Sequence, residues 1–216
     1  INGLFEIVQR IFGIEVIPVT DMSVWHPDVT TCLIRRQGVP LARFYFDLYA
    51  RAKKRGGAWM ADCRCRRQDP AHGLTLPVAF LTCNFAPPVN DQPALLSHDD
   101  VVTLFHEFGH GLHHMLTQVD CASVSGINGV AWDAVELPSQ FLENWCWDPD
   151  ALNLISSHVE TGEPLPLVLL DKMQQARNYQ SGMQMVRQLE FALFDFRLHN
   201  EVDGEPGALQ AILGDV

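Results

Sequence analysis

The sequence predicts a mainly helical α+β protein that contains a small β-sheet. Residues 99–116 contain no proline and repeat their apolar side chains at helical spacing, and residues 166–202 continue such a pattern over a longer stretch. Residues 29–36 and 41–48, by contrast, have the character of short strands. The chain has 216 residues, of which 47% are hydrophobic, so it can bury one substantial core.

The N-terminal part predicts a helix followed by a hairpin. Residues 4–12 repeat as a helix that Gly13 can terminate. The two strands named above are joined by Gln37-Gly38-Val39-Pro40, which is typical of a hairpin turn. Residues 51–67 are basic and contain glycine. We interpret them as a solvated loop, and the alternative is the wall of a pocket for anionic peptides.

The elements after the hairpin are a strand, a loop and further helices. Residues 77–85 predict a short apolar strand, which is either an ordinary buried strand or an edge strand that pairs with an extended peptide. Residues 123–129 contain two glycines and are expected to be a loop. Asp148-Pro149 can open another helix, with proline at its first position. In the last helical pattern we expect an interruption near Gly182 and interpret the Met, Leu and Phe side chains as core.

The central helix has a start signal and two distinct faces. Ser97 followed by Asp100 resembles a capping box. At about 100° per residue, one arc collects the apolar side chains, and the opposite arc carries His106, His110 and His113. The apolar arc consists of Val101, Leu104, Phe105, Phe108, Leu112 and Met115. One face therefore packs and the other presents imidazoles.

His106-Glu107-Phe108-Gly109-His110 is an H-E-x-x-H motif on this helix. Residues four apart on a helix lie one above the other, so both imidazoles can reach one metal ion. Glu107 stands beside the pair, where it can take a proton from a water molecule. The motif predicts a site for one Zn²⁺ per chain and the chemistry of a zinc peptidase, provided that a third ligand exists.

The position of that third ligand distinguishes classes of zinc peptidase. One class requires glycine and histidine where this chain has His113 and Leu116, so its pattern fails. His113 shares the imidazole face, but it lies about 10 Å from His106 along the helix axis, which is too far for one ion. We interpret His113 as a residue that supports the ligands or lines the pocket.

A carboxylate from the following helix is the better candidate for the third ligand. Asp133 can cap that helix, and Asp133, Glu136 and Glu143 then recur near one face. One of them can bind the metal while the others accept hydrogen bonds from the imidazole N–H groups. We expect Asp133 to have that supporting role. For Glu143, a solvated acidic face is an equally open interpretation.

The chain resembles the thimet-oligopeptidase family of zinc peptidases (M3 type) through nearly its whole length. The resemblance is carried by the H-E-x-x-H motif and by the segment Gly-Val-Ala-Trp-Asp-Ala-Val-Glu-Leu-Pro-Ser-Gln-Phe-Leu-Glu-Asn-Trp at 129–145. Shorter matches lie at 25–29, 44–51, 54–59, 81–85 and 188–191.

The resemblance implies His106, His110 and Glu136 as zinc ligands and Glu107 as the general base. It also implies a thermolysin-like zincin core and cleavage of short unfolded peptides. Members of the family are longer, with a helical region before this segment and a His- and Tyr-containing segment after it that binds substrate. We therefore expect residues 1–216 to be a single partial catalytic domain that lacks both regions. The alternative is a zinc-stabilised fragment without catalytic activity.

Composition excludes several other functions. The net charge of −11 argues against nucleic-acid binding, and no apolar run approaches the roughly 18 residues of a membrane span. No signal peptide is visible. The six cysteines lack the spacing of a disulfide framework, and Cys63 and Cys65 alone are a weak metal signal. We expect reduced thiols and a cytoplasmic location.

Overall fold

The computed structural model describes residues 1–90, 92–202, 204 and 207–216. It contains two compact units, Ile1–Leu165 and Pro166–Val216. The first unit combines helices with a small mixed sheet, which confirms the predicted α+β class. None of the helices in the described ranges is long and apolar enough to cross a membrane.

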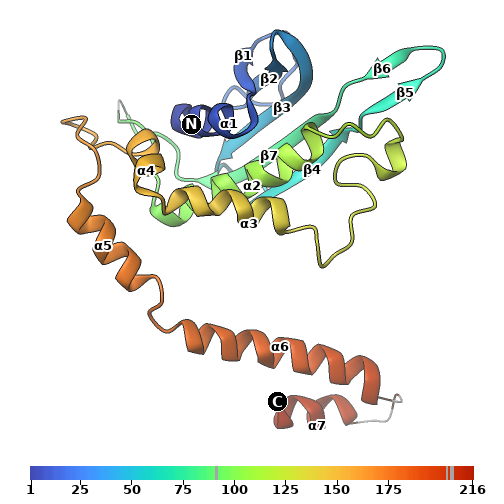
Figure 1. Ribbon diagram of the computed structural model, residues 1–216. Helices are drawn as coiled ribbons and strands as arrows, with labels where there is room; N and C mark the ends of the chain where they lie inside the picture. Colours follow the sequence, from blue (N-terminus) through green and yellow to red (C-terminus); the bar gives the residue numbers. More distant parts are fainter. Residues whose placement is uncertain (91, 203, 205–206) are drawn as a thin grey trace. The chain divides into compact units, whose positions relative to one another are not determined.

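A five-stranded sheet organises the first unit (Figure 1). Its strand order is β1-β2-β3-β7-β4, and only the β3–β7 pair is parallel. The strands are β1 (Glu15–Val19), β2 (Thr30–Arg36), β3 (Val39–Tyr49), β4 (Trp59–Arg64) and β7 (Val78–Phe85). A separate two-stranded ribbon is formed by β5 (Arg67–Asp69) and β6 (Gly73–Thr75). The predicted hairpin is confirmed, since β2 and β3 pair across a turn at Gln37 and Gly38 that has positive φ angles.

The structure corrects one sequence interpretation of this region and decides between the two alternatives left open for another. Residues 51–67 are not a continuous loop, because they contain the edge strand β4. The apolar strand at 77–85 is not an edge strand, because β7 lies between β3 and β4. A basic and glycine-containing sequence concealed β4, whose second half is exposed.

Helices α1 (Asn2–Phe12) and α2 (His98–Met115) pack on the sheet. Helix α3 (Leu137–Glu143) packs on α2 and α4 (Pro149–Ile155) on α1, and short 3-10 turns lie at Ala122–Val124 and Asn144–Cys146. Phe5 of α1 and Phe108 of α2 both pack on Phe44 and Phe46 of β3, with ring centroids 5.6–6.4 Å apart. These four rings join the two helices to the sheet in one core.

Three of the predicted helix ends agree with the structure. Gly13 ends α1 with a φ of 63°, and the side chain of Asp148 accepts a hydrogen bond from Ala151 at the start of α4. At the start of α2, Ser97 and Asp100 form the reciprocal bonds of a capping box. The predicted apolar arc of α2 is buried apart from Val101, which is half-buried.

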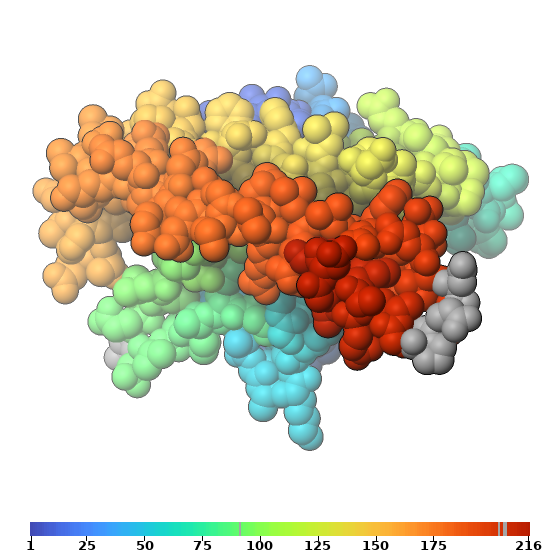
Figure 2. Space-filling model, turned by 90° about the horizontal axis from the view of Figure 1, so that it is seen from below, coloured from blue at the N-terminus to red at the C-terminus, as the bar shows by residue number. Residues whose placement is uncertain are grey.

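The second unit consists of α5 (Leu167–Ala176), α6 (Ser181–Glu201) and α7 (Ala208–Asp215). The break between α5 and α6 lies a few residues before the predicted Gly182. Helix α7 lies beside the end of α6 (Figure 2), where Arg197 donates a hydrogen bond of 2.8 Å to Asp215. Contrary to the sequence interpretation, the Met, Leu and Phe side chains of α6 are not core residues of this unit, since α6 has no buried residue.

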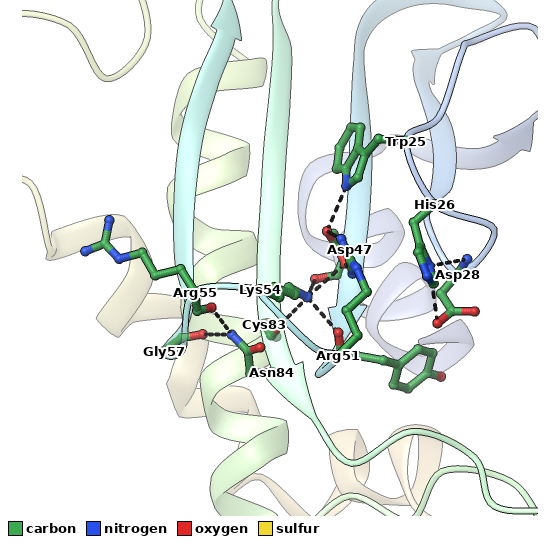
Figure 3. A network of polar contacts seen from close by, with 11 residues as sticks. Trp25, His26, Asp28, Asp47, Arg51, Lys54, Arg55, Gly57, Cys83 and Asn84 are labelled. Atoms are coloured by element: carbon green, nitrogen blue, oxygen red, sulfur yellow. Dashed lines mark hydrogen bonds and ion pairs between the residues drawn. The ribbon is translucent and has the colours of Figure 1, made fainter.

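A buried carboxylate, that of Asp47, lies near the C-terminal end of β3 and is surrounded by hydrogen-bond donors (Figure 3). Asp47 is 4% exposed and accepts two hydrogen bonds from Arg51, at 2.6 and 2.8 Å. Lys54 and Trp25 donate to the same carboxylate, at 2.8 and 3.1 Å. Burial alone would raise the pKa of Asp47, but these donors outweigh it and lower the pKa from 3.8 to about 2.

We predict that Asp47→Asn destabilises the protein in a pH-dependent way. Because the native pKa is depressed, the ionised carboxylate contributes about 2 kcal/mol of stability above pH 4 or so. This contribution is lost as the pH falls from about 4 to about 2, so the wild type and the variant should converge there. Urea unfolding followed by tryptophan fluorescence measures the difference. Asp21→Asn, which breaks an exposed pair with Arg43, is the matched control and should change stability much less.

Candidate metal centre

Three side chains from two elements meet at one point in the first unit. His106 and His110 extend from α2, and their Nε2 atoms are 3.2 Å apart. Oε2 of Glu136, at the N-terminal end of α3, lies 3.2 Å from Nε2 of His106 and 3.1 Å from Nε2 of His110. The three atoms form a nearly equilateral triangle. Among the residues that the structure describes, this is the one group of three His, Cys, Asp or Glu side chains that could hold a metal ion.

The triangle has the size that a tetrahedral zinc site requires. Ligand atoms at 2.0–2.1 Å from a tetrahedral ion are about 3.3 Å from one another. The three observed separations of 3.1–3.2 Å agree with that value. Two imidazoles and one carboxylate are also the ligand set of catalytic zinc sites that keep a fourth position open. The side chains therefore fit Zn²⁺ in both chemistry and geometry.

Neighbouring groups fix two of the three side chains in orientation. Nδ1 of His106 lies 2.6 Å from Oε1 of Glu143, so the Nδ1–H donates to this carboxylate and Nε2 is left as the metal-facing atom. The hydroxyl of the buried Ser139 lies 2.9 Å from Oε2 and 2.8 Å from the backbone oxygen of Glu136. Both supports come from α3, the same short helix that begins after Glu136.

Gly109 allows α3 to approach α2 this closely. A Cβ atom at this position would lie 2.6 Å from the backbone oxygen of Pro138 and 2.6 Å from Cα of Ser139. Backbone atoms cannot move aside as a side chain can, so any larger residue would force the helices apart. The second variable position of the H-E-x-x-H motif is thus the contact point between the two helices.

Glu107 lies under the same site, 7% exposed. Burial raises the pKa of Glu107, while His106 and the backbone N–H of Met60 oppose that rise. A carboxyl group beside the candidate ligands is placed to exchange a proton with a molecule bound there. Burial also lowers the pKa of His110, which favours its neutral, metal-binding form.

A cavity of about 510 Å³ opens over these groups. His106, Glu107, His110 and Glu136 line its polar part. The remaining wall consists of Ala58, Trp59 and Met60 from β4 and the entry to it, together with Ile127, Val130, Trp132 and Val135 from the segment between α2 and α3. The cavity is thus bounded by an edge strand on one side and by apolar side chains on the other.

The structure does not bring Asp133 to the imidazoles. Helix α3 begins at Leu137, so Asp133 lies in the preceding turn and not on the expected helical face. Its side chain is exposed and has no hydrogen bond or ion pair within the described ranges. Glu143 occupies the supporting position instead, since it binds Nδ1 of His106.

His113 lines a different cavity from the metal-site residues. That cavity has a volume of about 770 Å³ and is largely apolar, with Phe12, Leu112 and Phe141 among its lining residues. Burial lowers the pKa of His113. Of the two roles left open by the sequence, the structure agrees with pocket lining and provides no contact to the candidate ligands.

Comparisons with known proteins identify the family of this chain. The sequence matches Peptidase family M3 over residues 1–214, and the chain belongs to that family. It is 60% identical over 209 residues to oligopeptidase A of Escherichia coli, and the aligned region covers 96% of this chain and 31% of that protein. Identity to the dipeptidyl carboxypeptidase of Escherichia coli is 39% over 199 residues, covering 92% and 29%. Identity to saccharolysin of Saccharomyces cerevisiae is 35% over 207 residues, covering 92% and 29%.

We predict that Gly109→Ala weakens zinc binding by about 10–100-fold, because the added methyl group displaces α3 together with Glu136 and Glu143. The matched control is Gly111→Ala on the same helix. Its methyl group would meet the ends of the Leu81 and Met115 side chains, which can adjust. Competition with a chromogenic chelator measures the affinity. Equal losses in the two variants would show that the close helix approach is not what assembles the site.

Proposed function

We propose that this chain carries the catalytic zinc centre of a peptidase that hydrolyses short unfolded peptides. The observation that supports this most directly is the triangle of His106, His110 and Glu136 next to a buried Glu107. Membership in Peptidase family M3 supports the same reaction class. In this proposal His106, His110 and Glu136 hold one Zn²⁺ per chain.

A bound Zn²⁺ would polarise the scissile carbonyl and lower the pKa of an attacking water molecule. The protein's own contribution is proton transfer and orientation. Glu107 accepts the proton of the attacking water and later delivers it to the leaving amine. Glu143 keeps the Nδ1–H of His106 occupied, so that Nε2 points into the site. Ser139 keeps the Glu136 carboxylate in place by hydrogen bonding.

An extended peptide is the substrate that suits the surroundings of the site. Strand β4 is an edge strand, and its first two residues, Trp59 and Met60, line the cavity with the candidate ligands. A peptide can add to such an edge through main-chain hydrogen bonds, with little demand on its side chains. The apolar wall that includes Trp132, 93% exposed, offers contacts for apolar side chains.

The proposed activity belongs to the full-length reading frame that contains these residues. The chain spans 31% of the length of oligopeptidase A from Escherichia coli. We propose a single catalytic domain to which residues 1–216 contribute the metal centre. We also propose a cytoplasmic location with reduced thiols, which the six free cysteines support.

The ligand assignment predicts different results at Glu136 and at His113. Glu136→Ala should reduce zinc content severely, because it removes one of three ligand atoms. His113→Ala should leave zinc content unchanged, because His113 lines a separate apolar cavity. Metal analysis of the purified variants measures both. Loss of zinc in His113→Ala with retention in Glu136→Ala would refute the assignment.

The role proposed for Glu107 predicts that its replacement affects catalytic turnover but not zinc binding. Glu107→Gln should keep its zinc and lose about 10²–10⁴-fold in kcat, because the amide cannot accept the proton. The full-length enzyme is assayed with a quenched fluorescent peptide, with and without chelator. For the isolated 216 residues we expect bound zinc and little cleavage. Strong chelator-sensitive cleavage by the isolated chain, abolished by Glu107→Gln, would show that residues 1–216 are sufficient for catalysis and would contradict this expectation.

A further inference from the structure

The connection between β3 and β4 crosses the end of β7. These two strands are not neighbours, because β7 lies between them in the sheet. The chain leaves β3 at Tyr49 and enters β4 at Trp59, so residues 50–58 must pass over the C-terminal end of β7. Ala58, the last residue of this connection, already lines the cavity with the candidate metal ligands. The course of the connection therefore determines where β4 begins relative to the site.

A β-bulge in β7 lies under this crossing. Asp47 pairs with Thr82 and Tyr49 with Phe85, so that Cys83 and Asn84 together oppose a single residue of β3. The extra residue changes the direction of the main chain and of the side chains at this point. Both bulge residues then contact the connection above them (Figure 3).

Lys54 is the first anchor of the connection. Its side chain is 5% exposed, and its ammonium group donates to the backbone oxygen of Cys83 and to the carboxylate of Asp47. The backbone oxygens of Asp47 and Tyr49 lie 2.9 and 2.8 Å from the same nitrogen. A buried ammonium surrounded by four oxygens holds the middle of the connection on both β3 and β7.

Asn84 is the second anchor, and it is closer to the site. Its side-chain amide donates to the backbone oxygens of Arg55 and Gly57, at 2.8 and 2.7 Å. Gly57 has a φ of 91°, a conformation that turns the chain into β4. The far end of β4 is held separately, since the buried His114 donates from Nε2 to the backbone oxygen of Arg64 at 3.0 Å.

We propose that Lys54 and Asn84 are positioning residues for the peptide. They fix the first residues of β4 beside the candidate metal ligands, where the free edge of the strand can pair with the main chain of a substrate. The inference rests on the proposed function, because it assumes that the peptide lies along β4. Neither residue lines the cavity. Both act through the main chain of residues 55–60, so their effect should be on peptide pairing and not on the metal.

Asn84→Asp tests the second anchor with little change of shape. The carboxylate cannot donate and would face two carbonyl oxygens, so the turn before β4 should detach. Asn84→Ala removes the donors without adding a charge and guards against an effect of repulsion alone. Asn2→Asp, an exposed position at the start of α1, is the matched control. Lys54 is left unchanged, because its replacement would remove one of the hydrogen-bond donors of the buried Asp47 and so destabilise the fold.

The readout is binding of two peptides to the full-length protein in a Glu107→Gln background, so that turnover is not required. The two peptides of a pair are identical except that an ester replaces one amide, which removes one N–H donor from the main chain, and one pair is made for each position. At the position that pairs with β4, the protein with Asn84 unchanged should bind the amide peptide about tenfold more tightly than the ester peptide. With Asn84→Asp or Asn84→Ala this ratio should fall towards one, while zinc content stays unchanged and Asn2→Asp keeps the ratio.

Each alternative outcome overturns a different statement. A general loss of affinity with an unchanged amide-to-ester ratio would mean that Asn84 only stabilises the fold, and the positioning role would be wrong. No ester effect at any position would mean that the peptide does not pair with β4, which also overturns the inference. Absence of metal-dependent cleavage by the wild-type enzyme, with the ratios as expected, would instead refute the proposed function and leave the positioning role intact.

Discussion

The close approach of α2 and α3 at Gly109 is the constraint on which the candidate site depends. The two histidines come from one helix and the carboxylate from the start of the other, so their separation is the separation of two backbones. Side-chain flexibility cannot compensate for a displaced helix, because the three ligand atoms lie within 3.1–3.2 Å of one another. Glu143 and Ser139 also belong to α3. A single glycine thus sets the place of one candidate ligand and of two supporting groups.

The balance of charge around this contact favours a divalent cation. Three carboxylates, from Glu107, Glu136 and Glu143, surround two imidazoles in a region that is partly shielded from water. Without a positive charge, the like charges would repel one another at short distances. Burial is the main cause of the raised pKa of Glu107, and the negative charge of Glu136 adds to it. A cation held at the proposed metal site would offset this repulsion.

The sequence predicted the parts of this arrangement that depend on short-range periodicity. The H-E-x-x-H helix, its capping box and its apolar face follow from residues within two or three turns of one another. The start of α3 could not be predicted in this way. Asp133 has the properties of a cap, but the chain continues as turns as far as Glu136. The helix therefore begins three residues later than expected, and Glu143, not Asp133, has the supporting role.

Long-range pairing accounts for the remaining differences. Strand β7 is central and β4 forms the edge, whereas the sequence left the place of β7 in the sheet open and predicted a loop where β4 lies; no local pattern contains that information. The importance of Gly109 was likewise hidden, since it depends on Pro138 and Ser139 approaching from another element. Ser139 had one available signal, its position three residues after Glu136 on what was expected to be a helix.

The open edge of β4 has a consequence for pairing between copies of this chain. An unpaired strand edge is a template for any extended chain, including another copy of the same protein. Here the half of β4 near the candidate metal centre is partly covered, whereas the outer half, Asp62-Cys63-Arg64, is exposed and carries charges of both signs. Charged side chains on an edge discourage continuous sheet growth. The strand thus offers only a short length for pairing, enough for a few residues of a peptide and too little to nucleate a stacked assembly.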